Sequence, residues 1–285
     1  MKFSLSEKAS LVGPFDYAIL KTLYSFKDKR EFVQLPILKE KLDIKNNEEL
    51  KITLTKLNNL KLIYKSPTEF AYKLTFAGLD ILAIKMLYLN KSLNKLAEVI
   101  GEGKESIVYY GYDFSENQIA VKFHRVGTKR YKRSRINRDV DKKSWISLTV
   151  ENAKREYNAL ECVFNEGGYV PRPLGNAYNA VVMEYVKGSE LNRAKNENLN
   201  LKEIFDEILQ TLRIAYTICK VTHGDLSPYN ILIDEKYKPY IIDWPQATYS
   251  EERLKSDIIN IIKFFNKFKI DTNFQQVFNY VRGVL

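Results

Sequence analysis

The sequence predicts an α+β protein in two parts, from its length, its apolar content and a change of residue pattern near residue 95. The 285 residues suffice for one large domain or two ordinary ones, and 45% of them are hydrophobic, enough for a substantial core. Up to residue 93 apolar residues recur at helical spacing, whereas β-branched and aromatic runs typical of strands follow. We therefore expect one domain over residues 1–93 and a second over 94–285.

The first 93 residues are predicted to be mostly helical. Helical spacing is expected over 15–26, 35–42 and 46–60, with Asn47 as a helix N-cap, and a last helix should run from about Phe76 to Asn90. Two short strands, 62–66 and 70–75, flank a turn with Pro67 and Thr68. Three helices, a two-stranded wing and a fourth helix make a winged helix. The charged residues on and around its third helix are Lys45, Lys51, Lys56, Lys61, Glu48 and Glu49. DNA reading and docking to RNA, protein or the neighbouring domain all remain open.

The second part begins with strands and ends with helices. Strands are predicted at 107–112, 118–124 and 180–185, with a helix over about 148–164 between the second and the third. A helix over 201–220, short strands in "ILID" and "YIID", and a final helix near 253–268 follow. No internal repeat or low-complexity segment interrupts this order.

A glycine-containing stretch, "IGEGKESIVYYGY", lies at 100–112. Gly101 and Gly103 allow a tight turn and a close approach of the backbone to phosphate. Strand patterns on both sides predict a hairpin, which favours a kinase-type flap over a strand-to-helix phosphate loop. Lys104 and Ser106 are candidate phosphate contacts, and exposed loop residues are the alternative.

The strand "IAVKFH" places Lys122 within an alternating apolar run. A lysine there is often only a solvent-facing residue, but after a glycine hairpin it is the residue type that holds the α- and β-phosphates of ATP. A glutamate on the next helix should pair with it. Glu156 and Glu151 are the candidates, and we choose Glu156 because it lies in the middle of the predicted helix; a surface charge is the alternative.

The segment "HGDLSPYNILI" has the spacing of a catalytic loop for phosphoryl transfer. Asp225 can accept or orient the proton of an attacking hydroxyl, and Asn230 can bind a metal ion. Asp243, at the end of the following hairpin, is a typical magnesium ligand. His223 is expected to support the loop rather than to act as a base. Residues in this order and spacing predict a bilobal, protein-kinase-like domain.

The kinase-like domain is predicted to be minimal. We expect an N-lobe at about 94–183, a hinge at about 184–188 and a C-lobe at about 189–285. Adenine would contact the hinge region through residues Met183, Glu184 and Val186. Only 42 residues follow Asp243, too few for an activation segment and a helical peptide platform. Asp257 is expected either to brace the catalytic loop or to be an ordinary charge near a helix N-terminus.

The formal net charge of +10 favours an anionic partner. The segment 125–143 carries nine Lys or Arg and two Asp, so it holds most of this excess. We expect it to contact RNA phosphates, with a solvated flexible loop as the alternative. Thr128, Ser134 and Ser144 are candidates for self-phosphorylation.

The two cysteines, Cys162 and Cys219, have neither the spacing of a metal site nor the number of a disulfide framework. We expect buried free thiols in a reducing compartment. The N-terminus lacks the apolar core of a signal peptide, and no stretch is apolar enough to span a membrane. These observations predict a cytoplasmic protein.

The motifs "IGEGKES", "KFHRVGTKRYK", "SWISL", "HGDLSPYNILI" and "IIDWPQ", behind a winged helix, together resemble the RIO atypical serine/threonine protein kinases. The resemblance is to the winged-helix-bearing branch, of which the archaeal members are closest in size. It implies kinase or ATPase activity with ATP and Mg²⁺ (Mn²⁺ as an alternative), and a role in maturation of the small ribosomal subunit and its rRNA.

By motif, the resemblance implies that Lys122 and Glu156 position phosphate and that Asp225 is the catalytic aspartate. It also implies that Asn230 and Asp243 bind metal, and that Asp243 accepts a phosphoryl group transiently. "LSPY" and Trp244 depart from residues common in the branch. Protein substrates would include the chain itself. A small-molecule phosphotransferase and an ATP-binding RNA assembly factor with little catalysis remain as alternatives.

Overall fold

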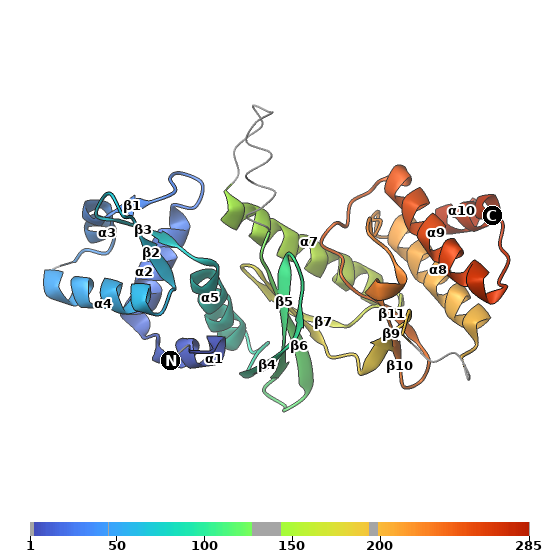
Figure 1. Ribbon diagram of the computed structural model, residues 1–285, viewed down its shortest axis with the longest axis horizontal. Coiled ribbons are helices and arrows are strands. Elements are labelled where there is room, and N and C mark those ends of the chain that lie inside the picture. The colour runs from blue at the N-terminus through green and yellow to red at the C-terminus, as the bar shows by residue number, and fades with distance from the viewer. Residues whose placement is uncertain (1–2, 45, 127–143, 194–198, 285) are drawn as a thin grey trace. The chain divides into compact units, whose positions relative to one another are not determined.

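The computed structural model describes residues 3–44, 46–126, 144–193 and 199–284 (Figure 1). The chain divides into two compact units. The first unit comprises Met1–Ala153 and Gly175–Val182, and the second comprises Lys154–Leu174 and Met183–Leu285. The domain boundary predicted at residue 93 is a different division and stays a prediction.

The N-terminal part of the first unit contains the predicted helices and wing strands. Its elements are α1 (Leu5–Leu11), α2 (Pro14–Ser25), β1 (Val33–Gln34), α3 (Leu35–Lys41), α4 (Asn47–Asn59), β2 (Ile63–Lys65), β3 (Ala71–Leu74) and α5 (Phe76–Leu89). The strands form an antiparallel sheet in the order β1-β3-β2. Helix α1 and strand β1 were not predicted. The N-cap of α4 is Asn46, which accepts the amides of Glu48 and Glu49, so the prediction of Asn47 is wrong.

A five-stranded sheet follows in the order β4-β5-β6-β8-β7. Its strands are β4 (Lys95–Glu102), β5 (Ser106–Tyr112), β6 (Gln118–His124), β7 (Pro173–Ala177) and β8 (Ala180–Glu184). Strands β4 and β5 are antiparallel, which confirms the predicted glycine hairpin. Strand β6 is buried from Ile119 to His124 and therefore lies in the interior of the sheet.

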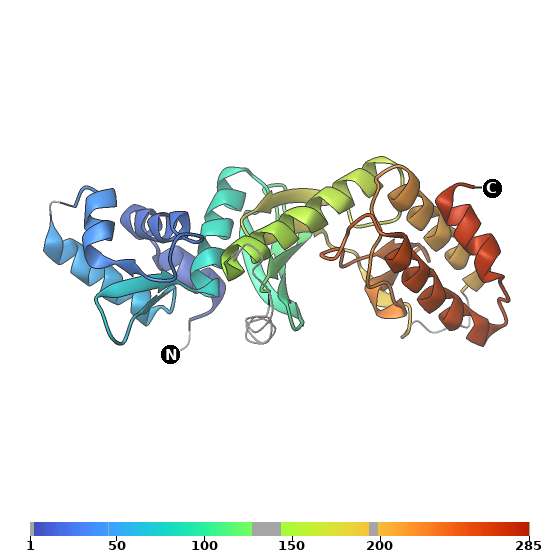
Figure 2. The same cartoon turned by 90° about the horizontal axis from the view of Figure 1, so that it is seen from above.

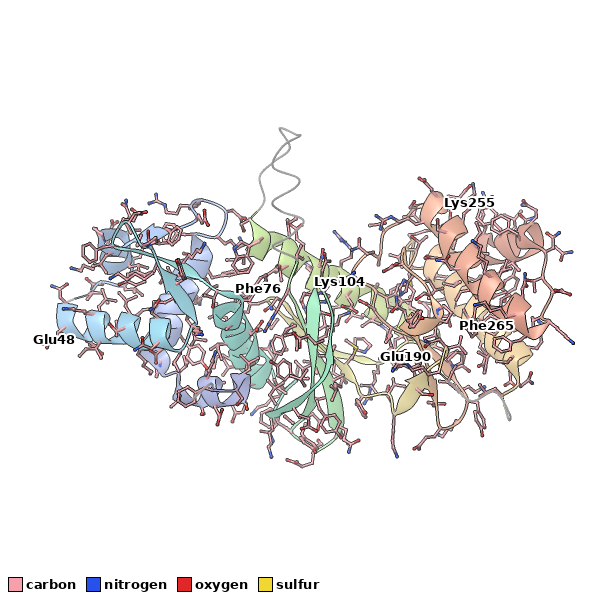
Figure 3. The ribbon with its side chains drawn as sticks, viewed as in Figure 1. Glu48, Phe76, Lys104, Glu190, Lys255 and Phe265 are labelled. Atoms are coloured by element: carbon pink, nitrogen blue, oxygen red, sulfur yellow. A yellow bond between two sulfur atoms is a disulfide. The ribbon has the colours of Figure 1, made fainter. Side chains whose placement is uncertain are left out.

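The remaining elements complete the fold with helices and a second sheet. They are α7 (Trp145–Asn165), β9 (Gly188–Glu190), α8 (Leu201–Thr217), η2 (Pro228–Asn230), β10 (Ile231–Asp234), β11 (Pro239–Ile241), α9 (Glu251–Phe265), η3 (Asn266–Phe268) and α10 (Phe274–Arg282). Helix α10, not predicted, packs against α8 and α9 (Figures 1 and 2). Between α8 and α9, the ring centroids of Phe205 and Phe265 lie 5.0 Å apart; Phe265 is labelled in Figure 3.

A buried acid connects helix α5 with the end of strand β6. Asp80 is fully buried, and its carboxylate accepts hydrogen bonds from Arg125 and from the side-chain amide of Asn179, the latter at 2.7 Å. Asn179 is held in turn by His124, whose amide donates to the Asn179 carbonyl at 2.8 Å. Burial raises the pKa of the Asp80 carboxyl, and the neighbouring Arg125 opposes this rise. The strand of Lys122 is thus anchored to the N-terminal helices.

A second acid of the N-terminal part, Asp28, caps the start of α7. The hydroxyl of Ser147 donates to both oxygens of the Asp28 carboxylate, at 2.7 and 2.8 Å, and the hydroxyl of Ser144 donates at 3.0 Å. The Asp28 carboxylate therefore lies at the N-terminus of helix α7, where the positive end of the helix dipole favours a negative charge. Of the predicted basic segment 125–143, only Arg125 and Val126 are described; Lys45, Thr128 and Ser134 also lie outside the described residues.

Cys162 and Cys219 form a disulfide, so the prediction of free thiols is wrong. Both residues are half-buried, and the bridge closes a loop with a sequence separation of 57. A cross-link of this span stabilises the folded state by about 4 kcal/mol in the chain-entropy model.

No helix among the described residues is long and apolar enough to cross a membrane.

We expect Gly78→Ala to destabilise the first unit. A Cβ at this position would lie 2.2 Å from the carbonyl oxygen of Leu62 and 2.7 Å from a Leu74 methyl, so the backbone must shift. Overpacking of this kind costs about 1–3 kcal/mol, which exceeds the helix-propensity gain of alanine. Urea denaturation followed by circular dichroism measures the change. Gly13→Ala is the control, because its Cβ would meet its nearest neighbour at 3.7 Å; equal stability of the two variants would contradict the prediction.

Candidate active site

The candidate site residues fall into two groups, one in each compact unit, and each group is described by itself. Gly101, Gly103, Lys104, Ser106 and Lys122 belong to the first unit. Glu156, Met183, Glu184, Val186, Asp225, Asn230 and Asp243 belong to the second.

The hairpin between β4 and β5 is closed by one hydrogen bond, from the amide of Gly103 to the carbonyl of Ser106 at 2.9 Å. Lys104 lies in this turn (Figure 3). Neither glycine has a positive φ, and a Cβ at Gly101 or Gly103 would meet only ordinary contacts, at 3.7 and 3.6 Å. Packing within the protein therefore does not require glycine at these positions. Glycine at both positions leaves the backbone accessible to a ligand, which fits a phosphate flap.

Lys122 is 6% exposed, so the alternative of a solvent-facing strand residue is wrong. It lies opposite Val108 of β5, in the same ladder that pairs Val108 with Gly101 of the hairpin. A lysine is almost never buried unless an opposite charge or a ligand accompanies it. Its position, one strand away from the glycine hairpin, fits the phosphate-holding role predicted for it.

Glu156 lies on α7 and is 1% exposed. One of its carboxylate oxygens accepts the backbone amide of Trp244 at 3.1 Å, directly after Asp243. The preceding residue, Arg155, donates to the carbonyl of Pro245 at 3.1 Å. Helix α7 therefore holds the 243–245 turn through two successive residues. The predicted pairing of Glu156 with Lys122 joins the two units and stays a prediction, and the exposed-charge alternative for Glu156 is wrong.

Two hydrogen bonds connect Asp225, Asn230 and the strand end before Asp243. The side-chain amide of Asn230 donates to the carbonyl of Asp225 at 2.9 Å, and the carbonyl of Asn230 accepts the amide of Ile242 at 2.9 Å. Asp225 is exposed, so its carboxylate is available to a substrate hydroxyl or to water. Asp243 has a φ of 69°, a left-handed conformation that non-glycine residues rarely adopt outside functional sites and turns.

Asp257 braces the catalytic loop, which decides between its two predicted roles. Its carboxylate accepts the amide of Gly224 at 2.8 Å and that of Leu226 at 2.9 Å, and the residue is 1% exposed. Gly224 has a φ of 82°, which permits this sharp turn. Burial raises the pKa of the Asp257 carboxyl, and the two amide hydrogen bonds oppose the rise.

His223 is a structural support, as predicted. It is fully buried; Nε2 lies 2.9 Å from the carbonyl oxygen of Ile242, and Nδ1 accepts the amide of Asp225 at 3.3 Å. Because Nδ1 accepts, Nε2 is the nitrogen that donates to the Ile242 carbonyl. The ring also packs on Trp244, at 4.8 Å between centroids. Nε2 thus holds the loop to the residue after β11, and Nδ1 holds the loop's own backbone at Asp225.

The hinge residues lie at the end of strand β8 and just beyond it. Met183 is buried, and Glu184 is the last residue of the strand. The amide of Glu184 donates to the carbonyl of Arg172 at 2.9 Å, which fixes the strand end. Val186 lies in the connection to β9. Their contacts to adenine stay a prediction.

The oxygen donors of Asn230 and Asp243 suit Mg²⁺, which prefers few protein ligands supplemented by water and phosphate. Among the described residues, no group of three His, Cys, Asp or Glu side chains is arranged to hold a metal ion. A magnesium ion at this site would therefore take its other ligands from a nucleotide and from water. The donor set fits such an ion.

Three supporting residues were not predicted: Arg155, Trp244 as a packing partner of His223, and Asn260. Asn260 donates to the carbonyl of Leu226 at 3.1 Å, one turn after Asp257 on α9. Its position next to Asp257 on the same helix face was the available signal. No sequence pattern marked Arg155 as a supporting residue, because the Pro245 carbonyl that it contacts is distant in the sequence.

Comparison with known proteins identifies relatives over most of the chain. A model of the RIO domain matches residues 107–277. The RIO-type serine/threonine-protein kinase Rio2 of Methanocaldococcus jannaschii is 32% identical over 237 residues, which cover 79% of this chain and 86% of that protein. Serine/threonine-protein kinase RIO2 of Saccharomyces cerevisiae is 26% identical over 270 residues, covering 88% of this chain and 63% of that protein.

A solved structure has a similar fold. The Rio2 kinase of Chaetomium thermophilum, crystallised as an ADP/Mg²⁺-phosphoaspartate complex, superposes with a TM-score of 0.78 at 21% identity, over 96% of this chain and 88% of that chain. This likeness confirms the predicted fold class, an α+β chain with a kinase-like part.

We expect Asp257→Asn to lower the free energy of unfolding by about 1–3 kcal/mol, because one buried loop amide then faces an NH₂ group instead of an acceptor. Chemical denaturation monitored through the fluorescence of Trp244, which is fully buried, measures the loss. Asp206→Asn is the matched control: Asp206 pairs with Lys202 on the surface of α8, where such pairs contribute little. A loss no larger than that of the control would show that the brace is unimportant.

Proposed function

The chain belongs to the RIO family of serine/threonine protein kinases, and from that premise we propose that it transfers the γ-phosphoryl group of Mg²⁺-bound ATP to a protein hydroxyl or to water. The catalytic-loop network carries this proposal. Asp225 and Asn230 share one hydrogen bond, and a second joins Asn230 to the residue before Asp243. A base and two oxygen ligands on one connected loop are the parts that phosphoryl transfer requires.

Each site residue has a separate task in the proposed reaction. Asp225 orients the attacking hydroxyl and accepts its proton, and its exposed carboxylate suits an incoming substrate. Lys122 neutralises the α- and β-phosphates, and the Gly101–Ser106 hairpin covers them. Asn230 and Asp243 would hold Mg²⁺, which when bound neutralises charge on the phosphate oxygens. Glu156 holds the turn of Asp243 through the Trp244 amide.

Asp243 is also the proposed acceptor of the γ-phosphoryl group when ATP is hydrolysed without a protein substrate. The Chaetomium thermophilum relative was crystallised with a phosphoaspartate. In the corresponding step here, a carboxylate oxygen of Asp243 forms a bond to the γ-phosphorus while the bond from that phosphorus to the ADP oxygen breaks. Water then attacks the acyl phosphate, releasing inorganic phosphate and restoring the carboxylate. The chain would act as an ATPase by this route and as a kinase when a hydroxyl replaces water.

We further propose that the partner is a precursor of the small ribosomal subunit and its rRNA. The net charge of +10 supports an anionic partner, and the segment 125–143 holds nine of the basic residues. The segment follows strand β6 directly and begins three residues after Lys122 in the sequence. RNA bound there would contact the chain close in sequence to the phosphate-holding lysine.

Asp225→Asn should lower kcat for magnesium-dependent ATP hydrolysis by about 10²- to 10⁴-fold, since the amide cannot accept the proton. Its affinity for Mg²⁺-ADP, measured by calorimetry, should stay within about threefold of wild type, because Asp225 is not assigned to the metal or the nucleotide. Asp243→Asn should lower both kcat and the magnesium-dependent part of ADP affinity. Glu235→Gln, at an exposed surface ion pair with Lys187, is the control. Wild-type turnover by both aspartate variants would refute the assignment.

Replacing five basic residues of the 125–143 segment with glutamine should weaken RNA binding and reduce its salt dependence. The residues are Lys129, Arg130, Lys132, Arg133 and Arg135. Each phosphate interaction that these substitutions remove should reduce the slope of log Kd against log salt by about 0.7–0.9. Fluorescence anisotropy with small-subunit rRNA fragments measures the slope. Lys187→Gln, an exposed lysine of the second unit, is the control. Unchanged affinity and slope would rule out a role for the segment.

A further inference from the structure

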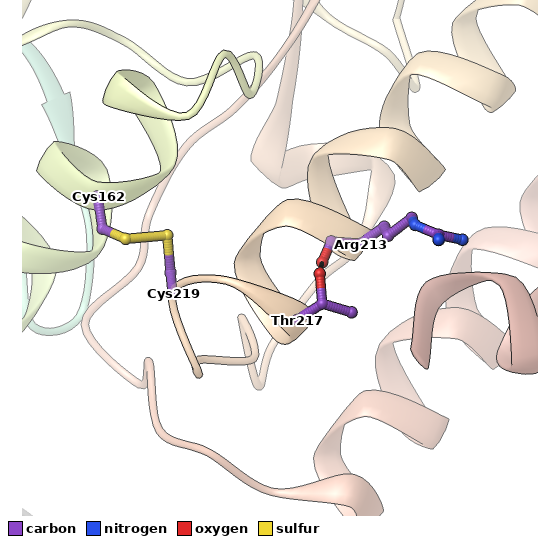
Figure 4. Close-up of a disulfide and its surroundings, with 4 residues drawn as sticks. All are labelled: Cys162, Arg213, Thr217 and Cys219. Carbon is purple, nitrogen blue, oxygen red and sulfur yellow. Dashed lines mark hydrogen bonds between the residues drawn. A yellow bond between two sulfur atoms is a disulfide. The ribbon is translucent and has the colours of Figure 1, made fainter. Parts of the chain in front are cut away.

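The Cys162–Cys219 disulfide joins two elements that carry different parts of the proposed site (Figure 4). Cys162 lies in the last turn of α7, and Cys219 follows Ile218, the C-cap of α8. The two Cα atoms are 5.8 Å apart. These are the only cysteines of the chain, so the sulfur atoms have no alternative partner within it.

Each cysteine lies six positions from a site residue. Cys162 follows Glu156 on α7, and Cys219 precedes Asp225 on the segment that enters the catalytic loop. Helix α7 is continuous from Cys162 back to Glu156, which holds the Trp244 amide. The segment after Cys219 is equally constrained: the Val221 amide donates to the carbonyl of Ala215 at 2.9 Å, and that of Thr222 donates to Thr248 at 2.9 Å.

The residues around the two cysteines are partly exposed. Glu161, Phe164, Ile218 and Lys220 are exposed, whereas Val163 is fully buried. The last turn of α8 is held by its own hydrogen bond, from the Thr217 hydroxyl to the Arg213 carbonyl at 2.6 Å, rather than by α7 (Figure 4). A further hydrogen bond nearby runs from the Tyr169 amide to the Thr211 hydroxyl at 3.0 Å, two turns earlier on α8. The disulfide therefore adds a covalent connection between these two helix ends.

We propose that the Cys162–Cys219 disulfide is a positioning element of the active site, which holds the helix of Glu156 to the loop of Asp225 and makes phosphoryl transfer depend on the redox state of the chain. This inference rests on the proposed function. Displacements of about 1 Å at reacting groups can cost up to about 10²-fold in rate. Loss of the cross-link leaves the individual site residues intact but loosens their relative placement.

The cross-link is open to exchange, because both cysteines are half-buried rather than enclosed. A dithiol reductant attacks one sulfur as a thiolate, which breaks the protein S–S bond and forms a mixed disulfide. The second thiol of the reductant then closes it into a cyclic disulfide. Two electrons and two protons pass to the chain, leaving Cys162 and Cys219 as thiols.

The test compares the oxidised chain, purified without reductant, with the same chain treated with dithiothreitol. Thiol titration in guanidinium chloride should find no thiol in the first sample and two in the second. Reduction should lower kcat for magnesium-dependent ATP hydrolysis by about 10-fold. KM for ATP should change less than about threefold, because the cross-link joins the segments of Glu156 and Asp225 rather than the proposed adenine contacts. Reoxidation should restore kcat. The Cys162→Ala, Cys219→Ala double variant should match the reduced wild type and ignore the reductant.

Amide hydrogen exchange gives a measurement that does not require turnover. Exchange at Thr222 to Leu226 should be faster in the reduced chain and in the double variant, while exchange in strand β6 should be unchanged. Two thiols in the unreduced sample, or equal exchange and equal kcat in both redox states, would overturn the proposal. ATP turnover that is measurable but independent of redox state would overturn only this inference. Redox-dependent exchange without any turnover would instead contradict the proposed function.

Discussion

The carboxylate of Asp257, buried beneath the catalytic loop, accepts the amides of Gly224 and Leu226, and the placement of Asp225 between them depends on this pair of hydrogen bonds. The loop reverses at Gly224, whose positive φ permits it, and the reversal leaves Asp225 exposed while its neighbours Leu226 and His223 are buried. An unpaired carboxylate at this depth would be costly, and so would two unpaired amides. The carboxylate and the two amides satisfy each other's hydrogen-bonding needs. This pairing favours a single conformation of the loop.

The same solution recurs at two other buried acids. Glu156 binds the amide of Trp244, and Asp80 binds the side chains of Arg125 and Asn179. In each case a carboxylate on a helix fixes the conformation of an irregular segment. Hydrogen bonds between near neighbours in the sequence would not fix that conformation by themselves. Helices are suited to this task because the backbone groups of their interior are already paired. The fold thus places its functional loops by reference to helices as well as to one another.

Local patterns predicted most of the elements, and non-local contacts account for what was missed. Strand β6 coincides with the predicted 118–124, since its composition favours a strand whatever surrounds it. Strand β1 has two residues and exists because β3 pairs with it, so no local signal marks it. The disulfide joins residues 57 apart, and spacing alone could not reveal that α7 and α8 end side by side. Asp257 could be placed on a helix, but only the folded chain shows which amides its carboxylate meets.

The contact between Asp80 and Arg125 has a consequence for evolution of the chain. Arg125 belongs to the strand-rich part, yet its guanidinium is neutralised by an acid from α5, and Asn179 shares that acid. Removal of the N-terminal helices, by gene truncation or recombination, would take the Asp80 carboxylate from this cation and leave this amide with one acceptor fewer. The two parts are therefore expected to be inherited together, and a descendant that lost the first would need compensating substitutions at positions 125 and 179.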